Sequence, residues 1–377
     1  MISETTQAAS CGEVSRGRIA FIDGFRGIAI LLVLGYHYFH RWAARGFYPY
    51  CDMLAGFPPF EYGYHGVDLF FSVSGFVIAM TLESTRGILE FAVRRLARLW
   101  PAMILCSTLT YAFLIWHPIY FPQSPRNFLS SWTFLSGPVV WQRIFPGFNS
   151  SWIDGAYWSL FVEVRFYLLA SLCYFSNRRG FWLLFPVLAM LSVVAYWLAW
   201  SFDSQELAKL IGEVTVAPSL PWFVLGMSMY RRYKRELHAA NVSLCLAFSS
   251  MILVAATDSR WSALVTFLIV AVLFLACLSI QRVNRMFSAR WLVVLGVSSY
   301  SLYLLHQNIG VTLISLIASA FSLEPIPSIA VAVFVATCIA LLAWLIYRYW
   351  EAPMNRKIVR WFQNSRETRR RILTNET

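Results

Sequence analysis

Residues 23–41 read DGFRGIAILLVLGYHYFHR, and this stretch decides the fold of the chain. It is mostly apolar and close to the roughly 20 residues that a membrane-spanning helix needs. It also carries Arg26 near its start and His37 near its end, which a helix would separate by roughly 16 Å along its axis. Ionisable groups at membrane depth are costly and usually mark function. The pair therefore indicates a functional site, although Arg26 alone is explained equally well by snorkelling to the interface and His37 by a satisfied core histidine.

The composition extends this interpretation to the whole chain. Of 377 residues, 58% are hydrophobic and 13% are charged, whereas soluble domains carry about 25% charged residues. This excludes a soluble globular protein and predicts an all-α fold, a polytopic membrane helix bundle of about ten transmembrane helices. The candidate spans lie near residues 22–42, 66–83, 99–116, 155–175, 180–200, 214–230, 239–256, 261–280, 291–319 and 326–349.

The basic residues indicate an orientation. Most of the 31 Lys and Arg residues fall in the segments that would be cytoplasmic if the N-terminus were inside. The positive-inside rule then places both termini in the cytoplasm. The net charge of +12 is thus explained by topology, and we expect no nucleic-acid partner.

Three regions follow from these patterns. Residues 1–18 are polar and contain no hydrophobic stretch, so we expect a disordered cytoplasmic leader. Residues 19–353 form the membrane domain, and residues 354–377 form a basic cytoplasmic tail suited to the anionic inner leaflet. The seven cysteines are scattered without a C-x-x-C pair, so we expect neither a disulfide framework nor a metal site.

Residues 84–98 (STRGILEFAVRRLAR) alternate apolar and basic side chains with a helical period. We expect this segment to lie on the inner membrane surface and lead into the third span, with Pro101 in that span's first turn. Its arginines and the first-span arginine form a basic set on the cytoplasmic side: Arg26, Arg94, Arg95 and Arg98. Arginine suits phosphate through bidentate hydrogen bonds. On charge alone, anchoring of the last three to lipid headgroups is the better explanation.

A second set of polar residues is expected in the outer half of the membrane. Counting along each span places four ionisable residues and one serine at similar depth: His37, Asp68, Ser159, Glu163 and His306. Nothing in the sequence forces these residues to face each other. The cost of burying them in lipid favours it.

Several motifs in order resemble the acyltransferase-3 family of bacterial inner-membrane enzymes. They are Arg26-x10-His37, GVDLFFSVSGF at 66–76, Arg95-x-x-Arg98, WSLFVEVRFYL at 158–168, SYSLYLLH at 299–306 and RYWEAPMNR at 348–356. The resemblance covers about Ile19 to Pro353. The chain departs from the family at Val164 and Arg165, where a second acidic residue is common. It also shows no esterase-like domain of the kind that some members carry, so we expect a stand-alone transferase.

The resemblance implies transfer of an acyl group, most often acetyl, from cytoplasmic acetyl-CoA to a hydroxyl of an outward-facing glycan or lipid-linked saccharide. Acyl-CoA would be the donor substrate, its phosphates held by the basic set, and no cofactor would be bound. Such a reaction needs a base and a stabilised oxyanion.

Histidine is the natural base, so we expect His37 in this role, oriented by Asp68 or Glu163. His306 is either a second proton handler or a structural histidine. The candidate oxyanion donors are each better explained by packing: Ser159, Tyr167, Tyr300 and Tyr303.

Two other classes of protein stay open at this point. A transporter or flippase for an acyl group, an anionic solute or a glycan would also have about ten spans with buried charges. The chain shows neither an internal repeat nor the paired Gly/Pro breaks that mark transporter sites. A structural membrane subunit accounts least well for the buried ionisable set. A covalently acylated product would separate the enzyme from both.

Overall fold

The computed structural model describes residues 19–42, 47–54, 56–118, 120–135, 141, 144–145, 147, 150–257 and 259–375. The predicted leader, residues 1–18, lies outside the described residues. Within the described part, every regular element is a helix. This confirms the predicted all-α fold.

Nine helical stretches of the described residues are long and apolar enough to cross a membrane. Their main helices are α1 (Ala20–Tyr36), α4 (Gly66–Ser84), α5 (Ile88–Trp116), α8 (Trp158–Ser176), α9 (Phe181–Ser201), α12 (Leu237–Thr257), α13 (Trp261–Ser279), α15 (Arg290–Ala320) and α16 (Pro325–Ile346). A tenth candidate is broken: α10 (Gln205–Thr215) meets the segment containing α11 (Leu220–Tyr233) at 61°. The prediction of about ten spans is confirmed.

The remaining α-helices are short or follow the last span. They are α2 (Cys51–Leu54), α3 (Pro58–Glu61), α6 (Pro125–Ser131), α14 (Gln281–Phe287) and α17 (Ala352–Asn375). A π-helical turn, His37–Arg41, extends α1, and a second one, Tyr347–Glu351, joins α16 to α17. Single π-helical turns inside longer helices occur often at functional sites, and one of these begins at the predicted base.

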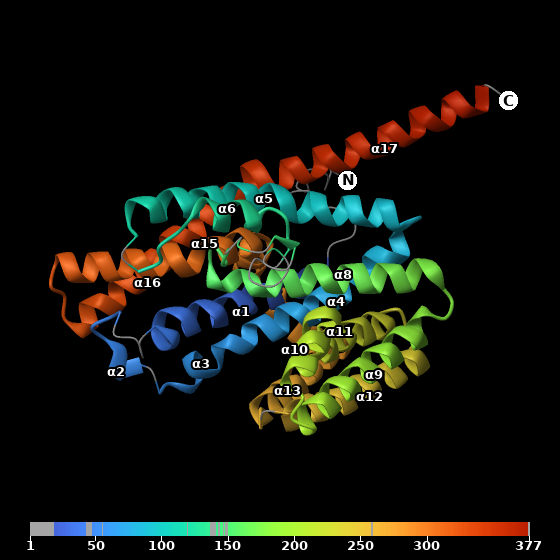
Figure 1. The fold of residues 1–377 in the computed structure, drawn as a ribbon, viewed down its shortest axis with the longest axis horizontal. Coiled ribbons are helices and arrows are strands. Elements are labelled where there is room, and N and C mark those ends of the chain that lie inside the picture. The colour runs from blue at the N-terminus through green and yellow to red at the C-terminus, as the bar shows by residue number, and fades with distance from the viewer. Residues whose placement is uncertain are drawn as a thin grey trace, which may run out of the picture.

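The long helices form one bundle. α1 packs against α15, α15 against α16, and α4 against both α1 and α11. Helices α9 to α13 gather on one side of the bundle, where α11 joins them to α4 (Figure 1). A Cβ atom at Gly296 would overlap the carbonyl oxygen of Asp23, and one at Gly226 would overlap that of Ser72. Small residues thus let the helix backbones touch, as is common between helices in membranes.

The third span differs from its prediction. Segment 84–98 and span 99–116 form one continuous helix, α5, and Pro101 lies in its middle rather than in its first turn. The prediction for Pro101 is therefore wrong. Proline inside a helix removes one backbone hydrogen bond, which membrane helices tolerate when a neighbour satisfies the freed groups. Separately from the bond that the proline removes, the carbonyl oxygen of Pro101 accepts a hydrogen bond from the Trp350 indole at 2.8 Å, which ties α5 to the second π-helical turn.

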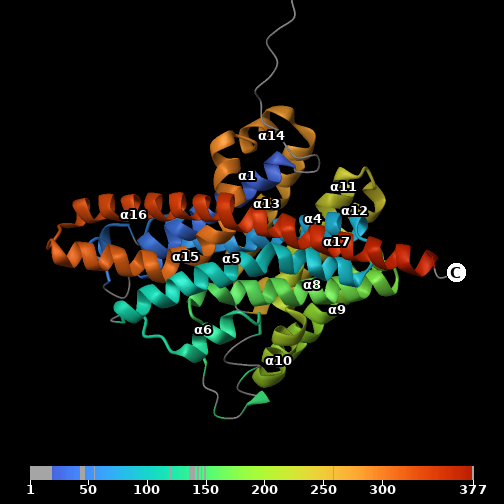
Figure 2. The same ribbon diagram turned by 90° about the horizontal axis from the view of Figure 1, so that it is seen from above.

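The last span also continues beyond its predicted end. After the π-helical turn the chain proceeds as α17, which packs along α5 and projects past the end of the bundle (Figures 1 and 2). Arg366 of α17 pairs with Glu90 of α5 at 3.7 Å. The segment predicted as a basic tail is thus a helix docked on the bundle.

Candidate functional site

A row of three cavities runs through the bundle between α1, α4, α5, α8 and α15. The arginine-side cavity, about 430 Å³, is lined by Arg26, Arg98 and Glu351 among others. The waist, about 90 Å³, shares Arg26 and Arg98 with it. The histidine-side cavity, about 350 Å³, contains His37 and shares Tyr303 with the waist. Arg26 and Arg98 of the predicted basic set therefore lie at the opposite end of this row of cavities from His37, the predicted base.

The structure brings His37 and His306 together. Nε2 of His306 lies 3.3 Å from Nδ1 of His37, and both side chains are buried. His37 Nδ1 also lies 2.9 Å from the Val33 carbonyl oxygen, and His306 Nδ1 lies 2.8 Å from that of Tyr303. Because a carbonyl oxygen only accepts, each Nδ1 carries the hydrogen. Nε2 of His37 is left with a lone pair, as a general base requires.

A second imidazole in the histidine-side cavity was missed in the sequence. His65 Nδ1 donates to the Asp68 carboxylate at 2.7 Å, and both residues line this cavity with His37. His65 Nε2 is buried and has no hydrogen-bond partner among the described residues. Asp68 therefore orients His65 and makes no contact of this kind with His37. The signal was present in the sequence, since His65 and Asp68 have the i, i+3 spacing of helical neighbours.

Glu163 lies in the waist rather than beside His37. Its Oε1 accepts hydrogen bonds from the Ser74 hydroxyl at 2.7 Å and from the Tyr167 hydroxyl. Both donors come from residues that also line the waist. Among the described residues, the carboxylate of Glu163 thus bonds to Ser74 and Tyr167 and makes no hydrogen bond or ion pair with either histidine.

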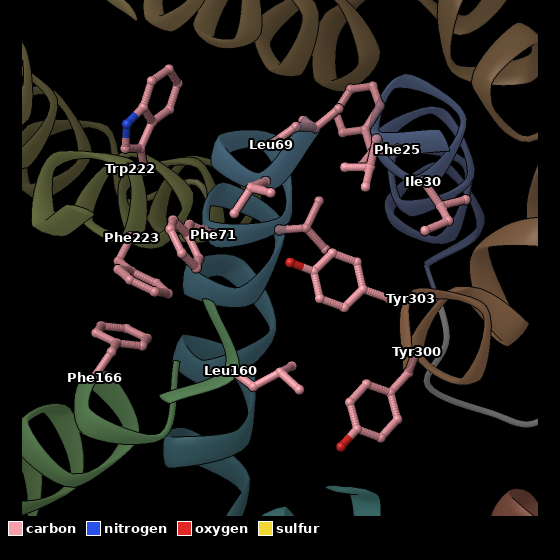
Figure 3. Close-up of a cluster of buried hydrophobic side chains, with 14 of the residues drawn as sticks. Phe25, Ile30, Leu69, Phe71, Leu160, Phe166, Trp222, Phe223, Tyr300 and Tyr303 are labelled. Carbon is pink, nitrogen blue, oxygen red and sulfur yellow. The ribbon is translucent and has the colours of Figure 1, made fainter. Parts of the chain in front are cut away.

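The candidate oxyanion donors all have protein partners. The Tyr303 hydroxyl donates to the Ala156 carbonyl oxygen at 2.7 Å and lies 2.8 Å from the Ser159 hydroxyl. The Tyr300 hydroxyl donates to the Leu99 carbonyl oxygen at 3.0 Å. In Figure 3, Tyr300 and Tyr303 point from α15 toward the space beside α4 that Leu160 also faces. These contacts favour the packing explanation for the hydroxyl groups.

The predicted basic set divides into two pairs. Arg94 pairs with Glu90 at 2.8 Å, and Arg98 pairs with the fully buried Glu351. In contrast, the other two guanidinium groups bind neutral hydroxyls.

Arg26 Nε donates to the Ser299 hydroxyl at 3.1 Å, and Arg95 Nη2 donates to that of Thr81 at 2.8 Å. Both arginines line the waist. Arg26 and Arg95 therefore present positive charge to the waist that these hydroxyls do not neutralise.

Asp154, which the sequence did not single out, fixes α15 beside the histidine pair. It is fully buried, and its two oxygens accept the backbone N–H groups of Ala156 and Asn308 at 2.8 and 2.9 Å. Burial raises the pKa of Asp154 to about 7, although both hydrogen bonds oppose the shift. The carboxylate links the segment before α8 to the residues that follow His306.

Comparisons with known proteins fit this arrangement. Residues 19–348 match the sequence profile of an acyltransferase domain family. The chain is 26% identical to the O-acetyltransferase OatA of Staphylococcus aureus over 89% of this chain and 57% of OatA. It is 25% identical to the peptidoglycan O-acetyltransferase OatA of Listeria monocytogenes over 91% of this chain and 56% of that protein.

The chain thus spans a little over half the length of these curated relatives. No solved structure matches it. The profile nevertheless covers the five spans that carry the site, from the start of α1 to the second π-helical turn. The chain belongs to the acyltransferase-3 family, a family of acyl-transferring enzymes.

Proposed function

We propose that this chain is a membrane O-acetyltransferase. It takes an acetyl group from acetyl-CoA at the arginine-side cavity and passes it through the waist to a glycan hydroxyl in the histidine-side cavity. One observation carries this proposal: the waist shares lining residues with the cavity on each side of it, so a cationic end and an imidazole end belong to one row of cavities. The arginine side would face the cytoplasm of a bacterium and the histidine side its exterior, in line with the charge bias of the sequence.

The sizes of the cavities suit different parts of the two substrates. The waist holds about 90 Å³, against about 430 and 350 Å³ on its two sides. A nucleotide or a sugar ring would be held at the wider ends, while an acetyl thioester is slim enough for the waist.

The chemistry at the histidine side uses the lone pair on His37 Nε2. As the acceptor oxygen attacks the thioester carbon, His37 takes the hydroxyl proton. The new C–O bond forms, the C–S bond breaks, and the proton passes to the leaving thiolate. His306 Nε2 accepts the Nδ1 hydrogen of His37, which favours the charged imidazolium during this step.

The acceptor class follows from the cavity and from the relatives. Trp158, Trp222 and Tyr64 line the histidine-side cavity, and aromatic faces suit the apolar faces of sugar rings. One relative is named a peptidoglycan O-acetyltransferase. We therefore propose a glycan acceptor of the cell envelope, with peptidoglycan as the first acceptor to test.

Mass spectrometry of envelope glycans tests this proposal. Cells with the intact gene, a deletion, and the deletion complemented by His37→Ala would be compared, with expression checked by immunoblot. Loss of one acetyl group from the same glycan in the last two strains is the expected result. Purified protein must also form acetylated acceptor from acetyl-CoA. Movement of an unmodified solute without any acylated product would instead identify a transporter.

A further inference from the structure

A cleft between α5 and α17 concentrates positive charge beside the arginine-side cavity. The α5–α17 cleft, about 350 Å³, is lined by Arg94, Arg95, Arg98, Asn355, Arg356, Val359 and Arg360. Five of these seven side chains are arginines, and none is acidic. Two of the arginines, Arg356 and Arg360, come from the segment that the sequence presented only as a basic tail.

Carboxylates of the protein balance only part of this charge. Glu90 pairs with Arg94 and Glu351 with Arg98. Arg95 donates to the Thr81 hydroxyl, lies over the Phe91 and Tyr167 rings, and interacts electrostatically with Glu163. Arg356 and Arg360 make no ion pair with any carboxylate in the described part of the chain. Like charges around one small volume repel each other, and a bound anion would reduce this repulsion.

Helix α17 is anchored at both ends of this cleft. The Trp350 indole donates to the Pro101 carbonyl oxygen at 2.8 Å just before α17 begins. Two turns beyond the cleft, Arg366 pairs with Glu90 at 3.7 Å. Arg356 and Arg360 lie between these anchors, one helical turn apart on one face. The anchors hold both arginines over the α5 arginines against their mutual repulsion.

We propose that the α5–α17 cleft binds the 3′-phosphate and diphosphate of acyl-CoA, and that Arg356 and Arg360 contact these groups from α17. This inference rests on the proposed function, since it assigns the donor's nucleotide end. The cleft shares Arg98 and Arg356 with the arginine-side cavity, and Arg95 and Arg98 with the waist. A nucleotide held here would direct its pantetheine arm toward the waist. Guanidinium groups match phosphate oxygens through paired hydrogen bonds.

Binding and kinetics of the full-length purified protein test this assignment. The variants are Arg356→Gln, Arg360→Gln and the control Lys357→Gln, which removes the same charge from an exposed neighbour that does not line the cleft. Each is measured with CoA and 3′-dephospho-CoA by calorimetry, and with acetyl-CoA by steady-state transfer. Nanodiscs without anionic lipid remove competition from headgroups, and a parallel set contains phosphatidylglycerol.

The expected result is a roughly tenfold weaker affinity for CoA in each cleft variant, the effect typical of one charge-assisted hydrogen bond. The KM for acetyl-CoA should rise in parallel while kcat stays within about twofold, and Lys357→Gln should match the wild type. At least one of the two variants should lose the preference for CoA over 3′-dephospho-CoA. Retained CoA affinity in both variants overturns the proposal, and an effect seen only with phosphatidylglycerol assigns the cleft to lipid headgroups instead. CoA binding that depends on these arginines without any acetyl transfer would uphold the cleft and overturn the proposed enzyme activity.

Discussion

The ion pair between Arg98 and Glu351 allows a quantitative test of the fold. Glu351 is fully buried, accepts the Ser301 hydroxyl hydrogen bond at 2.8 Å, and pairs with an arginine whose side chain is 22% exposed. Removing one partner of a buried pair typically costs about 3–5 kcal/mol, because the other charge stays buried without compensation. Glu351→Gln leaves the partly exposed Arg98, so we expect a loss near 3 kcal/mol. Arg98→Ala leaves the fully buried carboxylate, so we expect a loss near 5 kcal/mol.

The assay is denaturant-induced unfolding of the purified protein, with the double variant R98A/E351Q completing the mutant cycle. Because the double variant leaves no charge uncompensated, it should be more stable than Arg98→Ala; additive losses would total about 8 kcal/mol, so we expect a coupling energy of at least about 3 kcal/mol. Additive losses, or single variants as stable as the wild type, would refute the reasoning. If Arg98→Ala is as stable as the wild type, any loss of acyl-CoA use in this variant would have a cause other than lower stability. Arg26→Ala is the cleaner probe of donor binding, because it gives up only the Ser299 hydroxyl.

Three further predictions concern the site and its scaffold. His37→Ala should lower kcat of purified protein by about 10²–10⁴-fold, the usual contribution of a general base. His65→Ala should lower kcat/KM by roughly tenfold. Wild-type rates in either variant would remove that imidazole from the proposed chemistry. Gly226→Ala should cost about 1–3 kcal/mol in unfolding experiments, since its Cβ would overlap the Ser72 carbonyl oxygen and force α4 and α11 apart. Because burial raises the pKa of Asp154 to about 7, ionisation opposes folding; the free energy of unfolding should fall by up to about 4 kcal/mol as pH rises from about 4 to 7. Asp154→Asn should remove that slope, and an unchanged slope in the variant would assign it to other groups.

Helix number and depth were predictable from the sequence because both depend on properties that run along the chain. Hydrophobic length gives spans, and a constant rise per residue gives depth. The placement of His37 and His306 at one level rested on this rise, and their rings meet in the structure. The break between α10 and α11 was not predicted, because the hydrophobicity of a segment gives its length in the membrane but not the direction of its helix axis.

Rotation about each helix axis was not predictable in the same way. Asp68 and Glu163 were placed at the depth of His37, yet they bond to His65 and to Ser74. Which side of a helix faces which neighbour depends on packing between helices, and a single sequence contains little information about it. The close contacts at Gly226 and Gly296 result from that packing, but the sequence does not show which residue lies against each glycine.

The docking of α17 escaped prediction for an electrostatic reason. A basic segment after the last span is typical of a membrane-surface anchor, because anionic lipid attracts arginine. In the structure two buried acids hold the helix against a face that is itself basic: Glu351, just before α17, pairs with Arg98 of α5, and Glu90 of α5 pairs with Arg366 of α17. Local charge composition predicts repulsion there, and only the particular ion pairs reverse it.

The narrow waist affects whether the membrane that holds this protein can keep its ion gradient. A membrane that stores a gradient drives each elementary charge with about 2.3 kcal/mol per 100 mV, so an open watery passage would discharge it. The waist holds only about 90 Å³, and apolar side chains such as Phe70, Leu99 and Leu160 make up much of its wall. To pass, small hydrated ions would have to lose most of their water beside two guanidinium groups. The positive charge of these groups opposes cations in particular. In the proposed reaction, the waist would thus let a neutral acyl group pass between the two wide cavities and still insulate the bilayer against current.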